Sequence, residues 1–367
     1  MSDGAYAQFL ARTAEAAYAR RTPVNGSYEL TFRCNLSCVM CYNALPGNHR
    51  DAKANEMTLD EIKRIFDQLA DAGCLWLQLT GGEVLMRPDF KDIYLYAKSK
   101  GFLIRLFTNG TMLTPAMADF LAEHRPFAVE ISLYGATEET YEAVTRVRGS
   151  YKKCLRGIRL LLKRGLPLSL KTVAITLNQH ELGQMQTLCD ELGVRFRYDP
   201  DINPRIDGDR GPLAYRLTPE QVVALDRQTP PRARELSESI CAAAPPPAGA
   251  DAPLYACAAG ETAFHIDPAG QMTPCIMTRR GGYDLCRGDF DEAWQQVFPG
   301  LRAGTRRVGE DEPSGYSHCT GWAQLENDGD GARAVAHAAL VARLREKAFA
   351  RTRADLLMPH APANKQG

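Results

Sequence analysis

The chain has 367 residues, of which 45% are hydrophobic and 24% are charged, so it is long enough to bury one large core and a smaller module. Lys and Arg together number 44, as do Asp and Glu, and this balance excludes the strong basic field that draws a protein to nucleic acid or to an anionic membrane. With eleven cysteines, no apolar run of the ~18–20 residues that a membrane span needs, and no signal-peptide pattern in residues 1–21, we expect a cytoplasmic protein.

Between residue 27 and about residue 200, β-branched or aromatic runs alternate with amphipathic segments, which predicts an α/β fold built from βα units. Six strands are expected, at Tyr28–Phe32, Leu75–Leu79, Leu103–Phe107, Ala128–Leu133, Leu168–Ile175 and Val194–Tyr198. Explicit signals mark the helices between them. Thr58 and Glu61 form a capping box, and Thr114 precedes a proline at a helix start. Gly165 ends another helix.

Polar or glycine-rich residues follow five of these predicted strands. In chain order they are Cys34–Cys41, Gly81–Glu83, Thr108–Gly110, Ser132 and Asp199, while Lys171 lies inside the fifth strand. Parallel α/β folds and barrels gather their ligand sites at the carboxyl ends of the strands. The sequence therefore predicts one site at this edge of the sheet.

The first of these clusters is a CxxxCxxC motif formed by Cys34, Cys38 and Cys41. Three thiolates on one short loop can hold three irons of a cubane cluster and leave the fourth iron open for another ligand. A structural zinc site usually closes tetrahedrally with pairs of the CxxC type, and a disulfide framework belongs to small secreted chains with an even number of cysteines. An iron–sulfur cluster is therefore the first interpretation, and zinc is the alternative.

The CxxxCxxC motif, the Gly-Gly-Glu of Gly81–Glu83, the Thr-Asn-Gly of Thr108–Gly110 and the strand-end Ser132 resemble, in this order, the radical S-adenosylmethionine (SAM) superfamily. The resemblance covers roughly residues 25–200. It implies a partial (β/α)6 TIM-like barrel with a [4Fe-4S] cluster on Cys34, Cys38 and Cys41, whose open iron SAM chelates. It also implies reductive cleavage of SAM to a 5′-deoxyadenosyl radical that abstracts hydrogen from a substrate.

Several residues are candidates for binding SAM. Gly81 and Gly82 let the backbone approach a ligand closely, and Glu83 can accept a hydrogen bond from its ammonium group. The resemblance implies that Ser132 contacts SAM and that Met40 packs near its adenine.

These candidates also have structural interpretations. Lys171 is a sixth candidate, with a snorkelling side chain as the alternative. The glycine pair can be a tight turn, Asn109–Gly110 a turn dipeptide and Ser132 a satisfied strand-end hydroxyl. No catalytic acid or base is assigned from the sequence.

The alternation of strand-like and helix-like segments ends after Asp199. The segment Pro230–Pro253 is rich in Ala and Pro and is expected to be a flexible connection. The expected organisation is a helical lead-in (1–24), a radical SAM barrel (25–215), a helix and Pro/Ala-rich linker (216–256), a small auxiliary-cluster domain (257–330), and a helix with a disordered tail (331–367).

A second cysteine set lies in the small domain. Cys257 and Cys275 flank two short β runs around an Asp-Pro-Ala-Gly turn, which predicts a hairpin that returns Cys275 beside Cys257. With Cys319 they resemble the start of a SPASM or twitch extension, although no cysteine follows Cys319, whereas a full SPASM domain continues. We expect one auxiliary cluster on these three thiols, in preference to a module that has lost its cluster. The fourth ligand is left open between Cys286, Cys241, His318, an exogenous ligand and the substrate.

The expected function is that of a radical SAM enzyme that modifies a peptide or protein. Its partners would be that peptide, or a small-molecule substrate, and an electron donor such as flavodoxin or ferredoxin. The second function class is the biosynthesis of a cofactor or small metabolite, of the pyrroloquinoline quinone or haem type. The third is a non-catalytic iron–sulfur or zinc scaffold.

Overall fold

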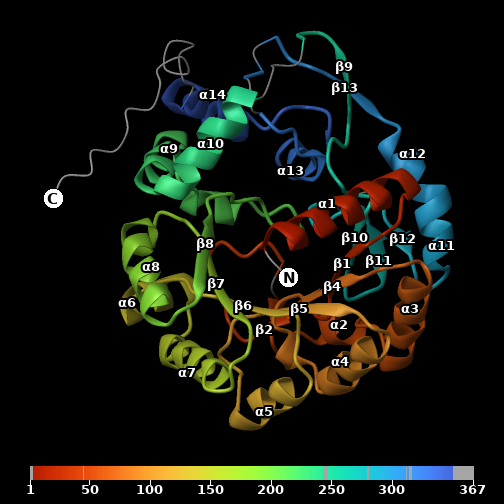
Figure 1. Cartoon of the computed structure of the whole chain (residues 1–367), viewed down its shortest axis with the longest axis vertical. Coiled ribbons are helices and arrows are strands. Elements are labelled where there is room, and N and C mark those ends of the chain that lie inside the picture. Colours follow the sequence, from red (N-terminus) through yellow and green to blue (C-terminus); the bar gives the residue numbers. More distant parts are fainter. Residues whose placement is uncertain are drawn as a thin grey trace.

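The computed structural model describes residues 3–43, 45–242, 247–278, 281–310, 312–313 and 316–349. Parallel strands in chain order form a curved sheet with helices along its outer side (Figure 1). These strands are β1 (Asn25–Glu29), β4 (Trp76–Thr80), β5 (Leu103–Thr108), β6 (Ala128–Ser132), β7 (Leu168–Val173) and β8 (Arg195–Asp199). The helices are α3 (Leu59–Asp71), α4 (Phe90–Ser99), α5 (Pro115–Glu123), α6 (Glu138–Thr145), α7 (Ser150–Leu162) and α8 (Leu182–Glu191). The predicted partial barrel of six βα units is confirmed.

The strands bury alternate residues against the helices, because successive side chains point to opposite faces of a sheet. Leu77, Ile104 and Ile131 are fully buried in the core between strands and helices. Side chains that point to the other face of the sheet, such as Arg105 on β5 and Lys171 on β7, line cavities on the inner face. The inner face therefore carries charged side chains among apolar ones.

Local signals set the helix starts as predicted. Thr58 and Glu61 form the reciprocal capping box of α3, and the Thr114 hydroxyl accepts from the Met117 backbone N–H at 3.1 Å. Gly165, after α7, has a φ of +63°, a conformation that glycine adopts without strain.

The first strand is the largest departure among the predicted strand bounds. It spans Asn25–Glu29 instead of Tyr28–Phe32, because the chain beyond Glu29 packs against the Gly-Gly-Glu turn. The Gly82 N–H donates to the Thr31 carbonyl at 2.7 Å, and the Glu83 N–H donates to the Arg33 carbonyl at 2.9 Å. Residues just before Cys34 are therefore fixed to the turn that follows β4.

The C-terminal hairpin joins the same sheet. Strands β10 (Ala263–Ile266), β11 (Gln271–Thr273) and β12 (Tyr283–Asp284) extend it beyond β1 in the order β12-β11-β10-β1. The hairpin was predicted, and Gly270 in its turn has a φ of +83°. The parallel pairing of β10 with β1 was not predicted. The small module and the barrel therefore share one sheet.

Aromatic side chains fix the hairpin to the helices that follow it. Phe264 lies 5.0 Å from Phe290, ring centre to ring centre, and Phe290 stacks on Trp294 at 5.9 Å. This segment comprises α11 (Phe290–Glu292), a π-helical turn (Ala293–Val297) and α12 (Phe298–Arg302). It is followed by β13 (Thr305–Arg307), paired with β9 (Asp251–Pro253), and by α13 (Thr320–Glu326).

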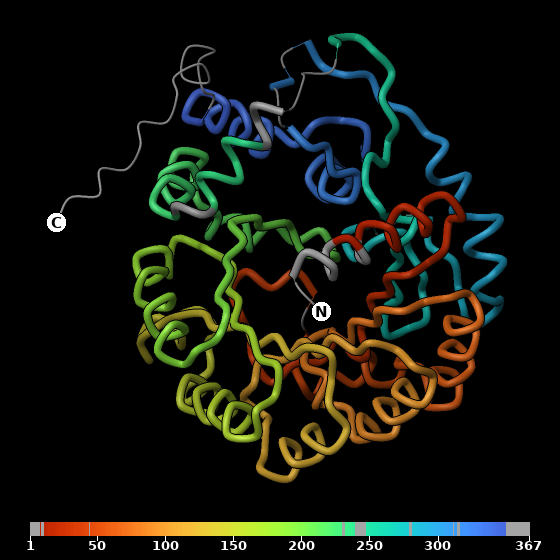
Figure 2. Tube along the Cα trace, viewed as in Figure 1, coloured from red at the N-terminus to blue at the C-terminus, as the bar shows by residue number. Residues whose placement is uncertain are grey.

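The flexible connection expected from Pro230 onward is wrong in its first part, because α10 spans Pro230–Ala242. Prolines are tolerated in the first turn of a helix, where their missing N–H has no intrahelical partner. This helix packs with α9 (Pro219–Gln228) and α14 (Ala336–Phe349), as Figure 2 shows. Buried Asp226 joins them through ion pairs with Arg232 and with Arg345, the latter at 2.7 Å. The last part of the predicted C-terminal helix and tail, residues 350–367, lies outside the described residues.

The N-terminal helix α1 (Asp3–Arg20) crosses one end of the barrel (Figure 1), where Ala17 packs with Val24 and Trp76. The cysteine loop contains a short parallel pair, β2 (Arg33–Cys34) and β3 (Leu45–Pro46), and leads to α2 (Arg50–Ala54). None of the described helices is both long and apolar enough to cross a membrane.

Candidate active site

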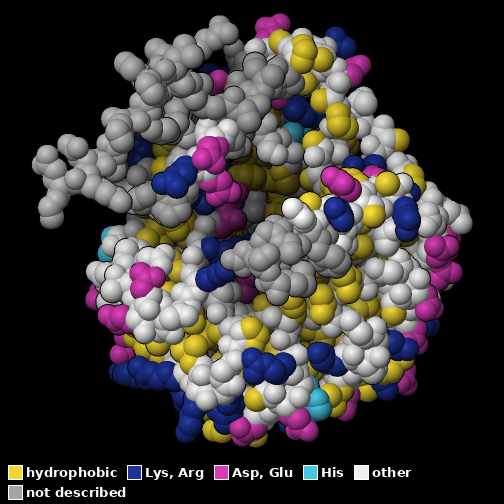
Figure 3. All heavy atoms as spheres, in the orientation of Figure 1, with side chains coloured by type: hydrophobic (Ala, Val, Ile, Leu, Met, Phe, Trp, Pro, Cys, Tyr) yellow, Lys and Arg dark blue, Asp and Glu magenta, His cyan; other side chains and the backbone are white. Residues whose placement is uncertain are grey.

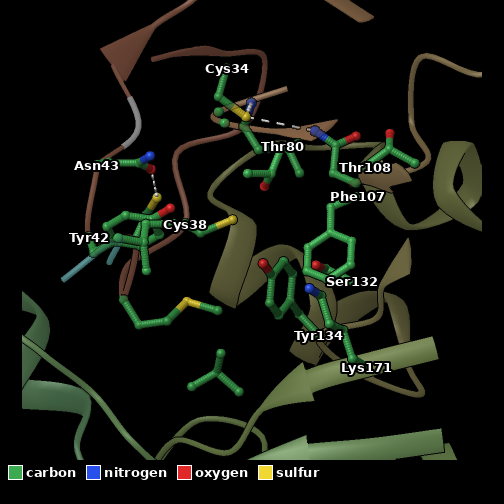
Figure 4. Close-up of a pocket in the computed structure, with 18 of the residues that line it drawn as sticks. Cys34, Cys38, Tyr42, Asn43, Thr80, Phe107, Thr108, Ser132, Tyr134 and Lys171 are labelled. Carbon is green, nitrogen blue, oxygen red and sulfur yellow. Dashed lines mark hydrogen bonds between the residues drawn. The ribbon is translucent and has the colours of Figure 1, made fainter. Parts of the chain in front are cut away.

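A cavity of about 450 Å³ opens at the carboxyl ends of the strands, within the ~300–1,000 Å³ usual for small-molecule sites (Figure 4). Every residue predicted for the first site lines it, except Glu83. Those residues are Cys34, Cys38, Met40, Cys41, Gly81, Gly82, Ser132 and Lys171. Figure 3 shows the molecule hollowed near its centre, with acidic and basic side chains around the hollow.

The three thiols of the motif stand in different surroundings. The Cys34 sulfur accepts hydrogen bonds from the Leu36 backbone N–H at 3.4 Å and from Asn109 Nδ2 at 3.7 Å (Figure 4). Burial raises the pKa of the Cys34 thiol to about 12 and raises the pKa of Cys38 well above its ordinary value. Without a metal both groups stay protonated, so a metal that binds them must release protons.

Two more side chains reach the other thiols. The Tyr134 hydroxyl, which points toward Cys38 in Figure 4, forms a hydrogen bond with it, and the Cys41 thiol donates to Asn43 Oδ1 at 3.6 Å. Within the described ranges, no group of three His, Cys, Asp or Glu side chains is arranged to hold a single metal ion. A cubane has a different requirement, since each cysteine ligates a separate iron.

Gly81 and Gly82 are needed for close backbone packing. A Cβ on Gly81, whose φ is +135°, would lie 2.3 Å from the Thr31 carbonyl oxygen. A Cβ on Gly82 would lie 2.4 Å from the Arg33 carbonyl oxygen. This packing requires glycine at both positions, and the same closeness brings both glycines to the cavity wall.

The Glu83 carboxylate is buried and turned toward the end of β5. It accepts hydrogen bonds from the Thr108 hydroxyl and the Asn109 N–H, both at 2.7 Å, and from the Leu85 N–H at 3.2 Å. Burial raises the pKa of Glu83, and these donors oppose the shift. Because Thr108 and Asn109 line the cavity, Glu83 fixes part of its wall. Its direct bond to the ammonium group of SAM stays a prediction.

Lys171 reaches the cavity beside an aromatic ring and a carboxylate. Its Nζ lies 3.2 Å from the centre of the Phe107 ring and 3.6 Å from a Glu130 oxygen (Figure 4). The same carboxylate binds Arg197 at 2.7 Å. Burial lowers the pKa of Lys171 to about 7, against the opposing effect of Glu130. The site therefore holds an amine that changes charge near neutral pH.

This pKa predicts a pH dependence of stability. Between pH 7 and the ordinary lysine pKa, Lys171 is protonated in the unfolded chain but largely neutral in the folded chain. Because the unfolded chain binds more protons in this range, the free energy of unfolding rises with pH. Below pH 7 the folded chain also carries the buried charge, and the stability is lowest. Between pH 7 and 9 we expect the native free energy of unfolding to gain up to about 2 kcal/mol relative to Lys171→Met. Urea unfolding of both metal-free proteins at the two pH values tests this, and parallel pH profiles would contradict it.

The three cysteines of the second set lie within electrostatic range of one another. Burial raises the pKa of the Cys319 thiol, and neighbouring Cys275 and Cys257 add to this shift. All three cysteines also act on the nearby Tyr255. Cys257 is exposed, and the Cys275 sulfur lies 3.2 Å from the Thr278 hydroxyl.

Two of the candidates for a fourth ligand have contacts of their own, and the buried Nδ1 of His318 has no hydrogen-bond partner among the described residues. Cys286 packs under the hairpin turn, with its sulfur 3.6 Å from the Ala269 carbonyl oxygen. His318 directs Nε2 to the Gly331 carbonyl oxygen at 2.8 Å. The side chain of Cys241 lies outside the described residues.

Comparison with known proteins identifies the family. The profile of the radical SAM superfamily matches residues 28–189. The mycofactocin maturase MftC of Mycobacterium ulcerans is 30% identical over 287 residues, which are 75% of this chain and 75% of that protein. The chain belongs to the radical SAM superfamily.

Two further similarities cover different shares of this radical SAM protein. The AdoMet-dependent heme synthase of Methanosarcina barkeri is 35% identical over 168 residues, 46% of this chain, and the match spans 47% of that relative's own length. The structure of Streptococcus suis SuiB bound to precursor peptide SuiA superimposes with a TM-score of 0.61 at 15% identity, over 80% of this chain and 71% of that one. The fold is thus that of radical SAM enzymes.

Radical SAM enzymes use a [4Fe-4S] cluster and SAM, and the residues present fit both groups. Three thiols line one cavity, and hydrogen-bond donors already point to the Cys34 sulfur, as is usual for cluster ligands. Cys34, Cys38 and Cys41 would hold the cluster, and the cavity beside them has the size of a small-molecule site.

The sequence did not indicate a buried polar network behind the cluster loop. Glu29 and His265 are both fully buried, with Oε2 and Nε2 3.3 Å apart. The Tyr42 hydroxyl donates to Glu29 Oε1 at 2.6 Å, and Asn43 donates to the same oxygen. The network joins the loop after Cys41 to β10. In the sequence the network shows only as a polar residue in each of two strands, Glu29 in β1 and His265 in β10. The sequence does not show that these strands pair.

Proposed function

We propose that this radical SAM enzyme modifies a peptide or protein by hydrogen abstraction. The observation that carries the proposal is the single cavity lined by the cysteine motif, the glycine turn, Ser132 and Lys171. The relationship to a maturase over three quarters of the chain supports a peptide substrate, and the SuiB fold accommodates a precursor peptide. Small-molecule biosynthesis is the second candidate, supported by the 35% identity to a heme synthase.

When bound, the cluster and SAM supply electron transfer and the 5′-deoxyadenosyl radical. The residues of the chain bind these groups and orient them. The Gly81–Gly82 turn presents its backbone to the ligand. Glu83 holds Thr108 and Asn109 in place and is proposed to bind the ammonium group of SAM. Met40 lies at the wall of the cavity, where the adenine would pack. Ser132 and Lys171 add a hydroxyl and an amine to the wall of the cavity (Figure 4). The barrel keeps bulk water from this chemistry.

We further propose one auxiliary iron–sulfur cluster on Cys257, Cys275 and Cys319, within a twitch-like unit of residues 257–330. Their mutual electrostatic influence supports it, as does the exposure of Cys257, which leaves room for an added group. The unit would follow a lead-in (1–24), the barrel (25–215) and a connecting segment (216–256), with residues 331–367 completing the chain.

The remaining partners are proposed on general grounds. The radical SAM cluster needs an electron donor such as flavodoxin or ferredoxin. The ten described cysteines are all free, which is typical of a reducing cytoplasm. With equal numbers of acidic and basic residues, nucleic acid is not a proposed partner.

The function is tested with the anaerobically reconstituted protein, dithionite and SAM. The proposal requires that 5′-deoxyadenosine forms. It also requires that the mass of a peptide substrate changes only when SAM is present. The candidate substrates are short peptides encoded beside the gene. Absence of 5′-deoxyadenosine would contradict the enzymatic assignment. Turnover of a tetrapyrrole or another small metabolite, without any peptide, would favour the second candidate.

Replacing Glu83 by Ala is expected to weaken SAM binding by at least about tenfold while most of the iron is retained, because one charged hydrogen bond and the support of Asn109 are lost. SAM affinity by equilibrium dialysis and iron content are measured on the same preparations. The control is Glu138→Ala, an acidic residue in the first turn of α6 on the outer side of the barrel. Unchanged SAM affinity in Glu83→Ala would remove Glu83 from the SAM site.

A further inference from the structure

Arg105 is a cation on the inner face of the barrel without a counter-ion. It lines a second cavity of about 250 Å³, together with Ser27, Trp76, Gln78 and Cys275. Its guanidinium makes no hydrogen bond or ion pair with any residue that the structure describes. A charged group that is partly removed from water without a partner loses solvation and gains nothing in return.

The neighbours of Arg105 in the sheet do not compensate its charge. In register it faces Gln78 on β4 and Ala128 on β6, and both are uncharged. The Gln78 amide donates to the Ser27 hydroxyl at 3.4 Å. The wall around the guanidinium is therefore polar but neutral.

Two carboxylates of the inner face have other partners. Glu130 lies 2.7 Å from Arg197, and Glu29 accepts from Tyr42 at 2.6 Å and lies 3.3 Å from His265. Neither carboxylate pairs with Arg105. The described residues therefore leave this guanidinium open to an anion from outside the chain.

The second cavity lies between the two cysteine sets. It shares Gln78 and Ile276 with the first cavity, and Cys275 is part of its wall. Asn109, which contacts the Cys34 sulfur, is four residues beyond Arg105 on the same strand path, so the two positions are ~13 Å apart. A substrate anchored at Arg105 can therefore extend toward the radical-generating site.

We propose that Arg105 binds a carboxylate of the peptide substrate and thereby holds the substrate between the two cysteine sets. The planar guanidinium matches a carboxylate with two parallel hydrogen bonds, a geometry that lysine cannot offer. The carboxylate is either the peptide C-terminus or an Asp or Glu side chain. This inference rests on the proposed peptide function and assigns an acidic group to its substrate.

The test uses the cluster-loaded enzyme with SAM under anaerobic conditions and isothermal titration calorimetry. The probes are short N-acetyl peptides of one sequence, made as the free acid or the C-terminal amide, each with Glu or Gln at one internal position. We expect peptides with the required carboxylate to bind about tenfold more tightly than their neutral counterparts. The two pairs of probes tell a C-terminal carboxylate from a side-chain one.

Arg105→Gln should abolish this preference, and Arg105→Lys should keep part of it. Arg195→Gln is the matched control, because Arg195 is an exposed arginine on β8 outside both cavities. Equal affinity for acidic and neutral peptides, no binding of any acidic peptide, or an unchanged preference in Arg105→Gln would each overturn the proposal. Cleavage of SAM without peptide is followed in parallel, since its absence in the native enzyme would instead count against the proposed function.

Discussion

Replacing Cys34, Cys38 and Cys41 together by Ala is expected to abolish SAM cleavage and to remove one cluster of about four irons per chain. Among the described residues these are the only cysteines that line the first cavity, so their loss leaves it without a thiol ligand. Iron, acid-labile sulfide and 5′-deoxyadenosine are measured after anaerobic reconstitution.

Cys286→Ala is the control for this variant, because Cys286 is exposed and belongs to neither cysteine set. It should keep both iron and SAM cleavage. Cleavage that survives in the triple variant, at the native rate and with native iron, would contradict the position of the cluster.

Replacing Cys257, Cys275 and Cys319 by Ala is expected to lower iron from about eight to about four per chain, because one auxiliary cubane would be lost. SAM cleavage should survive, since the first cavity keeps its three cysteines, whereas modification of the peptide should stop. The measurement pairs iron content with the electron paramagnetic resonance spectrum of the reduced protein.

About four irons in both the native protein and this variant would show that the C-terminal module has lost its cluster. The three cysteines would then only shape the surface beside the substrate. The change in iron content between the native protein and the variant thus distinguishes a module that holds a cluster from one that has lost it.

The barrel and most of its first site could be predicted because their signals are local. The Thr58–Glu61 capping box, the strand periodicity and the clusters after each strand depend on residues close in sequence, and the structure confirms these elements. A parallel barrel then brings the strand ends together without further information.

The features that were missed depend on contacts distant in sequence. Nothing near β1 indicates that β10, more than two hundred residues away, lies beside it, so the Glu29–His265 pair could not be predicted. The direction of the Glu83 side chain depends on donors from β5. The Ala- and Pro-rich composition of Pro230–Pro253 predicts a linker, but its first two prolines stand in the first turn of the helix Pro230–Ala242, where proline is tolerated.

The pairing of β10 with β1 has a consequence for dividing the protein. A chain cut after the barrel, before residue 257, would leave β1 as an open edge strand with unpaired N–H and C=O groups, and such an edge readily pairs with another chain. The same cut would remove His265 from the buried Glu29 carboxylate. An isolated barrel would therefore be prone to aggregation, and its behaviour would say little about the radical SAM site. The hairpin is therefore a structural part of the barrel wall rather than a separable attachment.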